Sequence, residues 1–123
     1  MTQYPIAFDI LLTAWNERDP VKLREKVAQS VTPDLIFTDP HYAIRGIDAF
    51  VDMVEEFFAR VGDVRLERTS GIDMHHDRAR YSWQIVWPDG KIFEGFDASA
   101  IDPETQKICR IDGFFGPLPA KQE

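Results

Sequence analysis

The segment "WPDGK" at residues 87–91 constrains the fold of this 123-residue chain most, because it sets the register of a β-hairpin. Its proline and aspartate suit the centre of a type I turn, and Gly90 suits the left-handed position of the glycine bulge that closes such a turn. Trp87 then pairs with Lys91. This pairing determines which residues lie opposite each other along the two strands.

The register places apolar side chains of both strands on one face, since strand side chains alternate. The predicted pairs are Ile85 with Phe93, Trp83 with Gly95, and Tyr81 with Asp97. A plain two-residue turn would instead mix apolar and charged partners on both faces, so we reject that slip. The anomaly is Asp97, an acid in an apolar wall, because carboxyl groups are seldom buried without a partner.

Three amphipathic helices are predicted in the first half of the chain. Apolar residues at i, i+3, i+4 and i+7 predict the first over about 4–17. Asp19 followed by Pro20 is typical of a helix start, and the second helix closes at residues 32–33. The third runs from residue 47 to a terminating glycine at 62.

The remaining segments have strand chemistry. "DLIFTD" at 34–39 predicts a short strand, and residues 64–115 predict four antiparallel strands in a meander. Helices followed by a sheet long enough to curl indicate an α+β domain with the helices packed into the concave side of the sheet. We expect one domain over residues 1–117 and a C-terminal tail over 118–123.

Composition limits the partners. Lys and Arg total 14 against 21 Asp and Glu, a net charge of −7, and no basic run offers a phosphate-binding strip, so nucleic acid is not an expected partner. A neutral hydrophobic small molecule is favoured, because the negative field hardly affects it. Cys109, the only cysteine, permits no internal disulfide. The chain shows neither a signal peptide nor a membrane span, so we expect no membrane partner and a cytoplasmic location.

Asp39 raises a second question, because it follows the apolar run "LIFT" and precedes Pro40. It could simply end the strand in an Asp-Pro turn, or it could point into the interior. Asp97 could likewise meet water near a strand end. If both acids face one aromatic cavity, they form a candidate acid/base pair, because an apolar site raises a carboxyl pKa into a useful range.

The residues then resemble a known group, the nuclear-transport-factor-2-like superfamily of ketosteroid isomerases and SnoaL-like polyketide cyclases. The resemblance spans nearly the whole chain. It is carried by "RDP", "LIFTDP", "RG", "TSGIDMHHDRARYSWQI", "GFD" and "RIDGFFGPLP". It implies a cone-shaped, cystatin-like roll of a curved, mostly antiparallel sheet around three helices. It also implies a homodimer.

The resemblance further implies the roles of the two acids. The general base of ketosteroid isomerases is the aspartate of a strand-end Asp-Pro, matched here by Asp39, and a protonated aspartate that holds the enolate oxygen is matched by Asp97. The second oxygen donor of that family, a tyrosine on the first helix, is matched by Leu11. Tyr42, Tyr81 or His76 is a possible substitute. No cofactor is implied, because the chemistry is proton transfer.

One histidine is a further candidate. Of the pair "HH" at 75 and 76, strand alternation turns His76 inward with Met74. Superfamily dehydratases combine a histidine with an aspartate, so His76 is expected as an auxiliary catalytic donor, unless it lies in solvent at the strand end. No metal site is predicted, since no ligand pattern of suitable spacing is present.

The substrate-binding wall is expected to be aromatic, though such residues also serve as plain core. Its predicted members are Trp15, Met53, Phe57, Tyr81, Trp83 and Phe115. Epoxide hydrolases of the fold need an Asp-Arg-Asp set, but the register turns Arg80 outward, and the resemblance to the isomerases, which matches Ile111, Gly113 and Phe115 to inward positions, turns Asp112 outward too. The leading hypothesis is therefore an isomerase, cyclase or dehydratase acting on a hydrophobic carbonyl compound. The alternative is a non-catalytic ligand-binding or dimerisation module.

Overall fold

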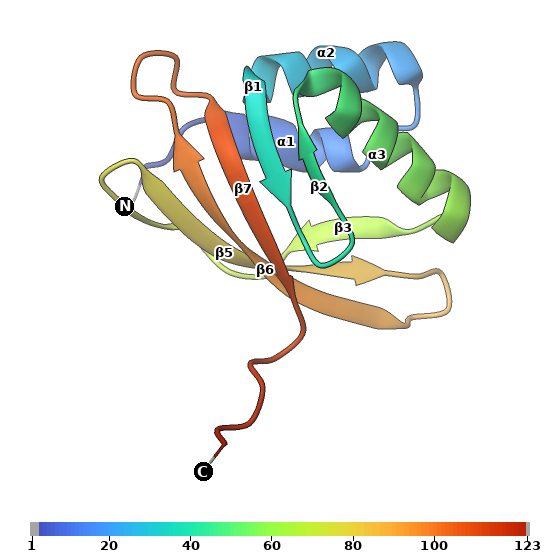
Figure 1. Ribbon diagram of the computed structural model, residues 1–123. Coiled ribbons are helices and arrows are strands. Elements are labelled where there is room, and N and C mark those ends of the chain that lie inside the picture. The colour runs from blue at the N-terminus through green and yellow to red at the C-terminus, as the bar shows by residue number, and fades with distance from the viewer. Residues whose placement is uncertain (1–2, 123) are drawn as a thin grey trace.

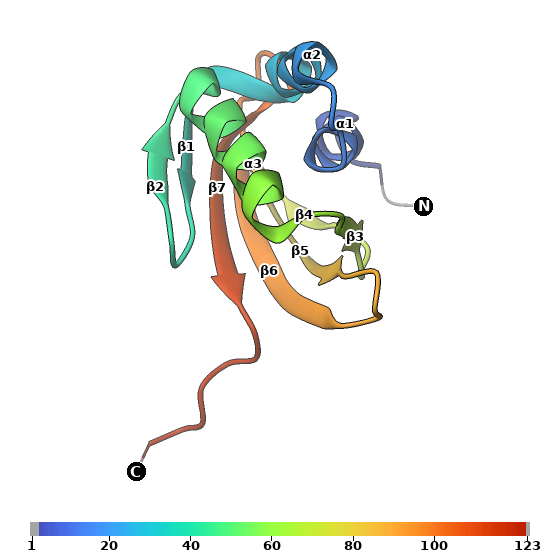
Figure 2. The same cartoon turned by 90° about the vertical axis from the view of Figure 1, so that its right-hand side faces the viewer.

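The computed structural model describes residues 3–122 and contains three helices against one curved sheet (Figure 1). The helices are α1 (Ala7–Trp15), α2 (Pro20–Ser30) and α3 (Ile47–Val61). The strands are β1 (Val31–Thr38), β2 (Ala43–Arg45), β3 (Arg65–Arg68), β4 (Asp73–His75), β5 (Arg78–Val86), β6 (Ile92–Ile101) and β7 (Ile108–Phe115). The predicted α+β class and the helices on the concave side are confirmed (Figure 2).

Local chemistry explains the helix starts. The Asp19 side chain accepts a hydrogen bond from the Lys22 amide at 2.9 Å, and Pro20 occupies the first turn of α2, where its missing N–H costs nothing. The predicted bounds of α3 agree with the structure to within a residue. The first strand begins earlier than predicted, at Val31, because the chain passes from α2 into extended backbone without a loop.

The sheet is ordered β2-β1-β7-β6-β5-β3, and β4 also pairs with β5. All pairs are antiparallel except β1 with β7. The predicted four-strand meander is therefore wrong in detail, since β3 and β4 share one partner. Between β3 and β4 the Thr69 amide donates to the Ser82 carbonyl, and the Ser82 amide donates to the Ser70 hydroxyl, both at 2.9 Å, so a side chain takes one of the two ladder bonds. The short strand β2 was not predicted.

The hairpin register is confirmed. The Gly90 amide donates to the Trp87 carbonyl and the Trp87 amide to the Lys91 carbonyl, both at 2.9 Å. The resulting pairs are Ile85 with Phe93, Trp83 with Gly95, and Tyr81 with Asp97. The turn therefore fixes which face of β5 and β6 meets the helices.

The packed core lies at one end of the roll, under α2 and the first turns of α3. Phe8, Leu23, Val27, Phe50 and Ile108 are almost completely buried there. Burying side chains of this size contributes about 1.5–3 kcal/mol each. The opposite end is framed by the β1–β2 turn, the end of α3 and the β5–β6 hairpin (Figure 1), and a cavity lined by residues of these segments leaves it less tightly filled.

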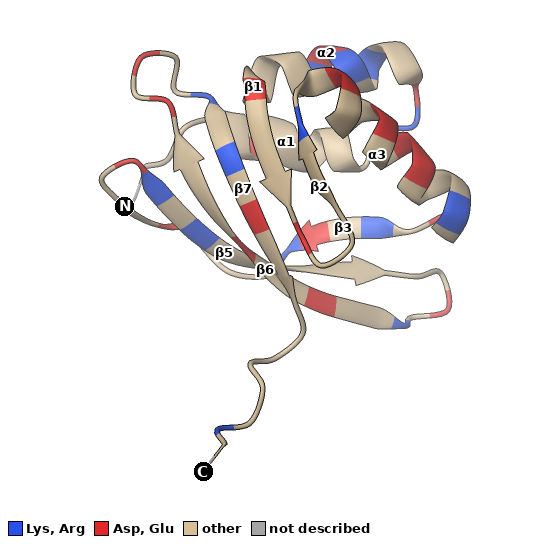
Figure 3. Ribbon diagram, in the orientation of Figure 1, with Lys and Arg blue, Asp and Glu red and all other residues tan. Residues whose placement is uncertain are grey.

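The surface carries charge of both signs. Acidic side chains follow α3, whereas Lys and Arg are spread over several helices and strands rather than along one strip (Figure 3). Within residues 3–122, no helix has both the length and the hydropathy needed to cross a bilayer.

Candidate functional site

A cavity of about 240 Å³ opens at the less filled end of the roll. Its wall comes from α1, β1, the β1–β2 turn, the end of α3, and strands β3, β5, β6 and β7. Apolar and aromatic side chains make up most of the wall. The polar and charged groups that line it are Asp39, His41, Tyr42, Arg60, Arg68, Tyr81 and Asp97.

Asp39 lies at this cavity because the β1–β2 turn holds its carboxylate. The backbone amides of His41 and Tyr42 both donate to Oδ1 of Asp39 at 2.8 Å. The Asp39 amide also donates to the Tyr42 carbonyl at 2.9 Å. Both interpretations of Asp39 therefore apply at once: its first oxygen closes a turn, and the residue still lines the cavity. Oδ2 has no hydrogen-bond partner among residues 3–122.

Asp97 lies on the inner face of β6 and is held by two side chains of β5. Trp83 donates from Nε1 to Oδ1 at 2.9 Å, and the Tyr81 hydroxyl donates to Oδ2 at 3.2 Å. Burial raises the pKa of Asp97 to about 6, the two donors oppose that rise, and the negative charge of Asp39 adds to it. The neutral acid is therefore accessible near physiological pH.

Tyr81 stays a donor over the same pH range. Burial raises the pKa of its hydroxyl well above the usual value, and the charge of Asp97 raises it further. Leu11 lies at the wall and brings no polar group, while the Tyr42 hydroxyl donates to Glu56 at 3.1 Å. Of the three possible substitutes for the missing donor, Tyr81 is the one in contact with Asp97.

The topology explains why two acids distant in sequence share one cavity. Strand β7 lies between β1 and β6, pairing in parallel with the first and antiparallel with the second. Asp97 is opposite Gly113 of β7, and Thr38, the residue before Asp39, is opposite Asp112. The two acids thus flank the same stretch of β7.

Gly95 makes room for the Trp83 indole. A β-carbon on residue 95 would overlap the six-membered ring of Trp83 and would lie 2.5 Å from the Phe114 carbonyl oxygen. With only hydrogen at this position, the indole lies across β6 and its N–H reaches Asp97. The sequence predicted the pairing of Trp83 with Gly95, but it did not predict the hydrogen bond from Trp83 to Asp97 that this pairing permits.

Gly95→Ala is expected to lower the free energy of unfolding by about 1–3 kcal/mol, because overpacking displaces the indole and the β7 backbone. Urea denaturation monitored by tryptophan fluorescence measures the effect. Gly71→Ala is the matched control, since a β-carbon there would meet nothing within 4 Å. Equal stabilities for the two variants would contradict the close packing of Trp83 on Gly95.

The pH dependence of stability offers a test of the Asp97 environment. Between about pH 4 and pH 6 the folded state keeps the Asp97 proton that the unfolded chain releases, so stability falls by up to about 3 kcal/mol as pH rises. Asp97→Asn lacks this fall. Denaturation of both proteins at several pH values isolates it, because the acids with lowered pKa, such as Asp9, contribute equally to both. A difference in stability between the two proteins that does not change with pH would contradict the raised pKa of Asp97.

Two predicted site residues lie elsewhere. His76 is exposed and has a left-handed backbone (φ 52°), so it leaves the strand after His75 and the alternation that would have turned it inward no longer holds. Its ring nitrogen Nδ1 faces Nδ1 of His75 at 3.2 Å instead. Met53 is buried within the packed core and does not line the cavity.

The other predicted wall residues lie at the cavity: Trp15, Phe57, Tyr81, Trp83 and Phe115. The sequence interpretation missed His41, whose ring centroid is 5.3 Å from that of Phe115 at the rim. Its position two residues after Asp39, in the same turn, was the available signal. Arg60 and Arg68 at the wall were also missed.

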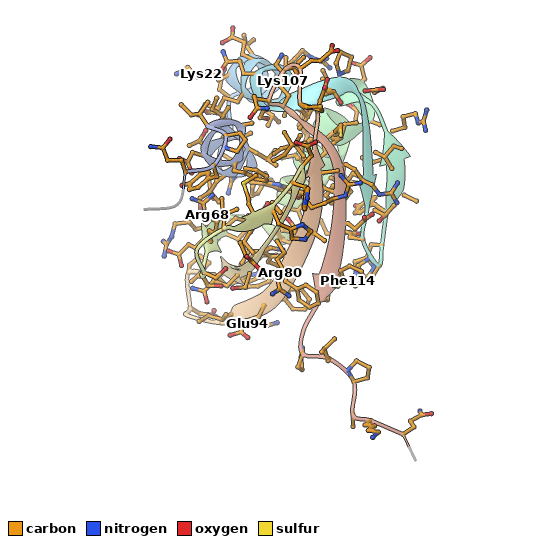
Figure 4. The ribbon with its side chains drawn as sticks, turned by 90° about the vertical axis from the view of Figure 1, so that its left-hand side faces the viewer. Lys22, Arg68, Arg80, Glu94, Lys107 and Phe114 are labelled. Carbon is orange, nitrogen blue, oxygen red and sulfur yellow. The ribbon has the colours of Figure 1, made fainter. Side chains whose placement is uncertain are left out.

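The arginine and acid of the epoxide-hydrolase pattern do not line the cavity. Arg80 donates to Asp73 at 2.7 Å on the exposed face of β5 (Figure 4). Asp112 accepts from the Thr38 hydroxyl at 2.8 Å and from Arg110 at 3.0 Å. Among the described residues, no group of three or more His, Cys, Asp or Glu side chains has the geometry of a metal site.

Comparison with known proteins gives a consistent family. The family model described as SnoaL-like domain matches residues 9–91. A solved structure of a proposed isomerase of the SnoaL-like family from Agrobacterium tumefaciens str. C58 superposes with a TM-score of 0.87 at 27% identity, covering 95% of this chain and 100% of that chain. No relative was found among curated proteins.

More distant structures share the fold. A proposed ketosteroid isomerase from Kribbella flavida DSM 17836 has a TM-score of 0.71 at 14% identity, covering 97% of this chain and 82% of that chain. A proposed polyketide cyclase from Sinorhizobium meliloti has a TM-score of 0.71 at 16% identity, covering 89% of this chain and 94% of that chain.

Proposed function

Because the chain belongs to the SnoaL-like domain family, we propose that it is a cofactor-independent enzyme that moves a proton next to the carbonyl group of a small hydrophobic compound. The observation that carries the proposal is that Asp39 and Asp97 line one mostly apolar cavity. Isomerisation, cyclisation and dehydration all proceed through such a step. The cavity volume of about 240 Å³ is just below the volumes typical of pockets that bind drug-sized ligands, and this favours a compact substrate.

Asp39 acts as the base. The turn amides fix one carboxylate oxygen, and the other accepts the proton from the carbon beside the carbonyl. A base must be oriented before the substrate arrives, and the two N–H donors hold the Asp39 carboxylate in place.

Asp97 acts as the acid. In its neutral form it donates a hydrogen bond to the substrate oxygen, where negative charge develops as Asp39 removes the proton. Trp83 and Tyr81 orient its carboxyl group. The pKa of about 6 favours an activity that declines as pH rises above that value, because the ionised acid cannot donate.

The proposal is tested by exchange of the α-hydrogens of small ketones for deuterium in D₂O, followed by NMR. Cyclohexanone and 2-tetralone are suitable probes, and quenching of tryptophan fluorescence measures their binding in parallel. Accelerated exchange supports the proposal. Binding without exchange would overturn the catalytic role and favour the non-catalytic binding module, whereas no binding of either ketone would overturn the substrate class.

The homodimer and the cytoplasmic location, expected from the sequence, stay predictions. His76 is not part of the proposal, because its side chain is exposed and does not line the cavity. His41 lies two residues after Asp39 in the chain and, unlike His76, lines the cavity.

A further inference from the structure

Arg68 brings a positive charge to the wall of the mostly apolar cavity. It is the last residue of β3, and its side chain is only 17% exposed. Its guanidinium carbon lies 6.0 Å from the ring centroid of Tyr81, whose hydroxyl donates to Asp97. The proposed mechanism uses the two acids and leaves this positive charge without a role.

The protein partners of Arg68 lie outside the cavity. Nη2 of Arg68 donates to Oδ1 of Asp9 at 2.8 Å and to the Tyr4 hydroxyl at 3.0 Å. Asp9 and Tyr4 do not line the cavity, and the Asp9 side chain is half-exposed. The two hydrogen bonds therefore anchor one nitrogen of the guanidinium away from the cavity, while Arg68 itself forms part of the wall.

The other two nitrogens of Arg68 are available to a ligand. A guanidinium group has five N–H donors, and both hydrogen bonds to Asp9 and Tyr4 come from Nη2. Nε and Nη1 have no hydrogen-bond partner among residues 3–122. Neither nitrogen is among the fully buried atoms that lack a partner, so both keep accessible surface. An arginine that uses one nitrogen for a first carboxylate can donate from the others to a second one.

The surroundings of Arg68 favour an anionic group. Apolar walls strengthen the attraction between the guanidinium and a ligand charge, because little water screens it. The charges of the wall do not repel a single negative charge, since Arg60 and Arg68 balance Asp39 and Asp97. Arg68 also lines an open groove beside α1, so an anion bound to it stays near water and loses only part of its hydration.

We propose that Arg68 binds a carboxylate group of the ligand, and that the ligand class is small hydrophobic carboxylic acids. The inference rests on the proposed function and deepens it, because it makes the substrate a keto acid rather than a neutral ketone. Net charge alone favoured a neutral ligand, but it does not describe the charges inside the cavity. The net charge of −7 still opposes a doubly charged group such as a phosphate.

The first test compares two probes of similar shape, 3-phenylpropionate and 3-phenyl-1-propanol, by calorimetric titration of the wild-type protein at neutral pH. The carboxylate should bind about tenfold or more tightly than the alcohol, because an ionised acceptor strengthens a hydrogen bond from arginine. Equal affinities, or no binding of either probe, would overturn the carboxylate site.

The second test changes the arginine. Arg68→Gln should bind the two probes with equal affinity, and its affinity for 3-phenyl-1-propanol should match that of the wild type. Arg65→Gln is the matched control, because Arg65 lies on the same strand, forms an exposed ion pair with Glu67 and does not line the cavity. It should keep the wild-type preference for the carboxylate. A preference that persists in Arg68→Gln, or that both variants lose equally, would overturn the site.

A third measurement needs no variant and therefore does not depend on how a variant folds. In spectra of ¹⁵N-labelled wild-type protein, 3-phenylpropionate should move the side-chain Nε–H resonance of Arg68 more than 3-phenyl-1-propanol does. The corresponding resonance of Arg65 should stay in place. An unmoved Arg68 resonance while 3-phenylpropionate binds would overturn the site.

The outcomes separate this inference from the proposed function. A preference for 3-phenylpropionate that is lost in Arg68→Gln, with no ketone exchange by the wild type, keeps the carboxylate site and removes the catalysis. Exchange of ketones by a wild-type protein that shows no such preference keeps the catalysis and removes the carboxylate site.

Discussion

Asp39→Asn is expected to lower the rate of α-hydrogen exchange by about 10²- to 10⁴-fold, the usual contribution of a positioned general base. The asparagine oxygen can still accept the two amide hydrogen bonds from His41 and Tyr42, so the turn and the fold should persist. An amide cannot take up the substrate proton. NMR-monitored exchange, with thermal unfolding as the check on folding, measures both effects.

The matched control is Asp73→Asn, which removes an acid in an exposed ion pair with Arg80 on β4. It should retain the wild-type exchange rate. If Asp39→Asn also retained that rate, the base would have to be another group. Equal losses in both variants would point to a general effect of charge rather than to a base.

Asp97→Ala is expected to reduce exchange by about 10²- to 10³-fold, the cost of removing one preorganised donor to a developing oxyanion. Ketone binding should weaken less than turnover, because the hydrogen bond strengthens as negative charge develops on the substrate oxygen. The rate and the fluorescence-derived affinity, measured on the same variant, separate the two effects.

Ser99→Ala serves as the control for Asp97→Ala. Ser99 lies two residues further along the same face of β6, it is buried, and its hydroxyl has no partner among the described residues. Its loss should leave exchange unchanged. A rate for Asp97→Ala within a factor of two of the wild type would remove Asp97 from the mechanism.

The register of the hairpin could be predicted because one turn carries the information. Once Gly90 fixes the bulge, every pairing between β5 and β6 follows, and so does the inward direction of Asp97. The place of Asp39 at the end of β1 was equally legible from its Asp-Pro dipeptide. These features are local, because a few adjacent residues determine each of them.

The errors came from features that neighbouring residues do not encode. His76 left the strand one residue earlier than alternation assumes, through a left-handed conformation that non-glycine residues seldom adopt. Met53 was grouped with the aromatic residues of the wall, but it lies in the packed core, because the sequence pattern of α3 does not tell which end of the roll each turn of the helix meets. The bond from Trp83 to Asp97 depends on tertiary packing over Gly95.

The place of β7 in the sheet has a consequence for how the protein matures. This strand is the last of the strands in residues 3–122, yet it lies between β1 and β6 and separates the segments that carry the two acids. During synthesis, Asp39 and Asp97 both emerge from the ribosome before the segment that aligns them. A chain cut before residue 108 would contain both acids but would not align them, so the proposed activity would require β7.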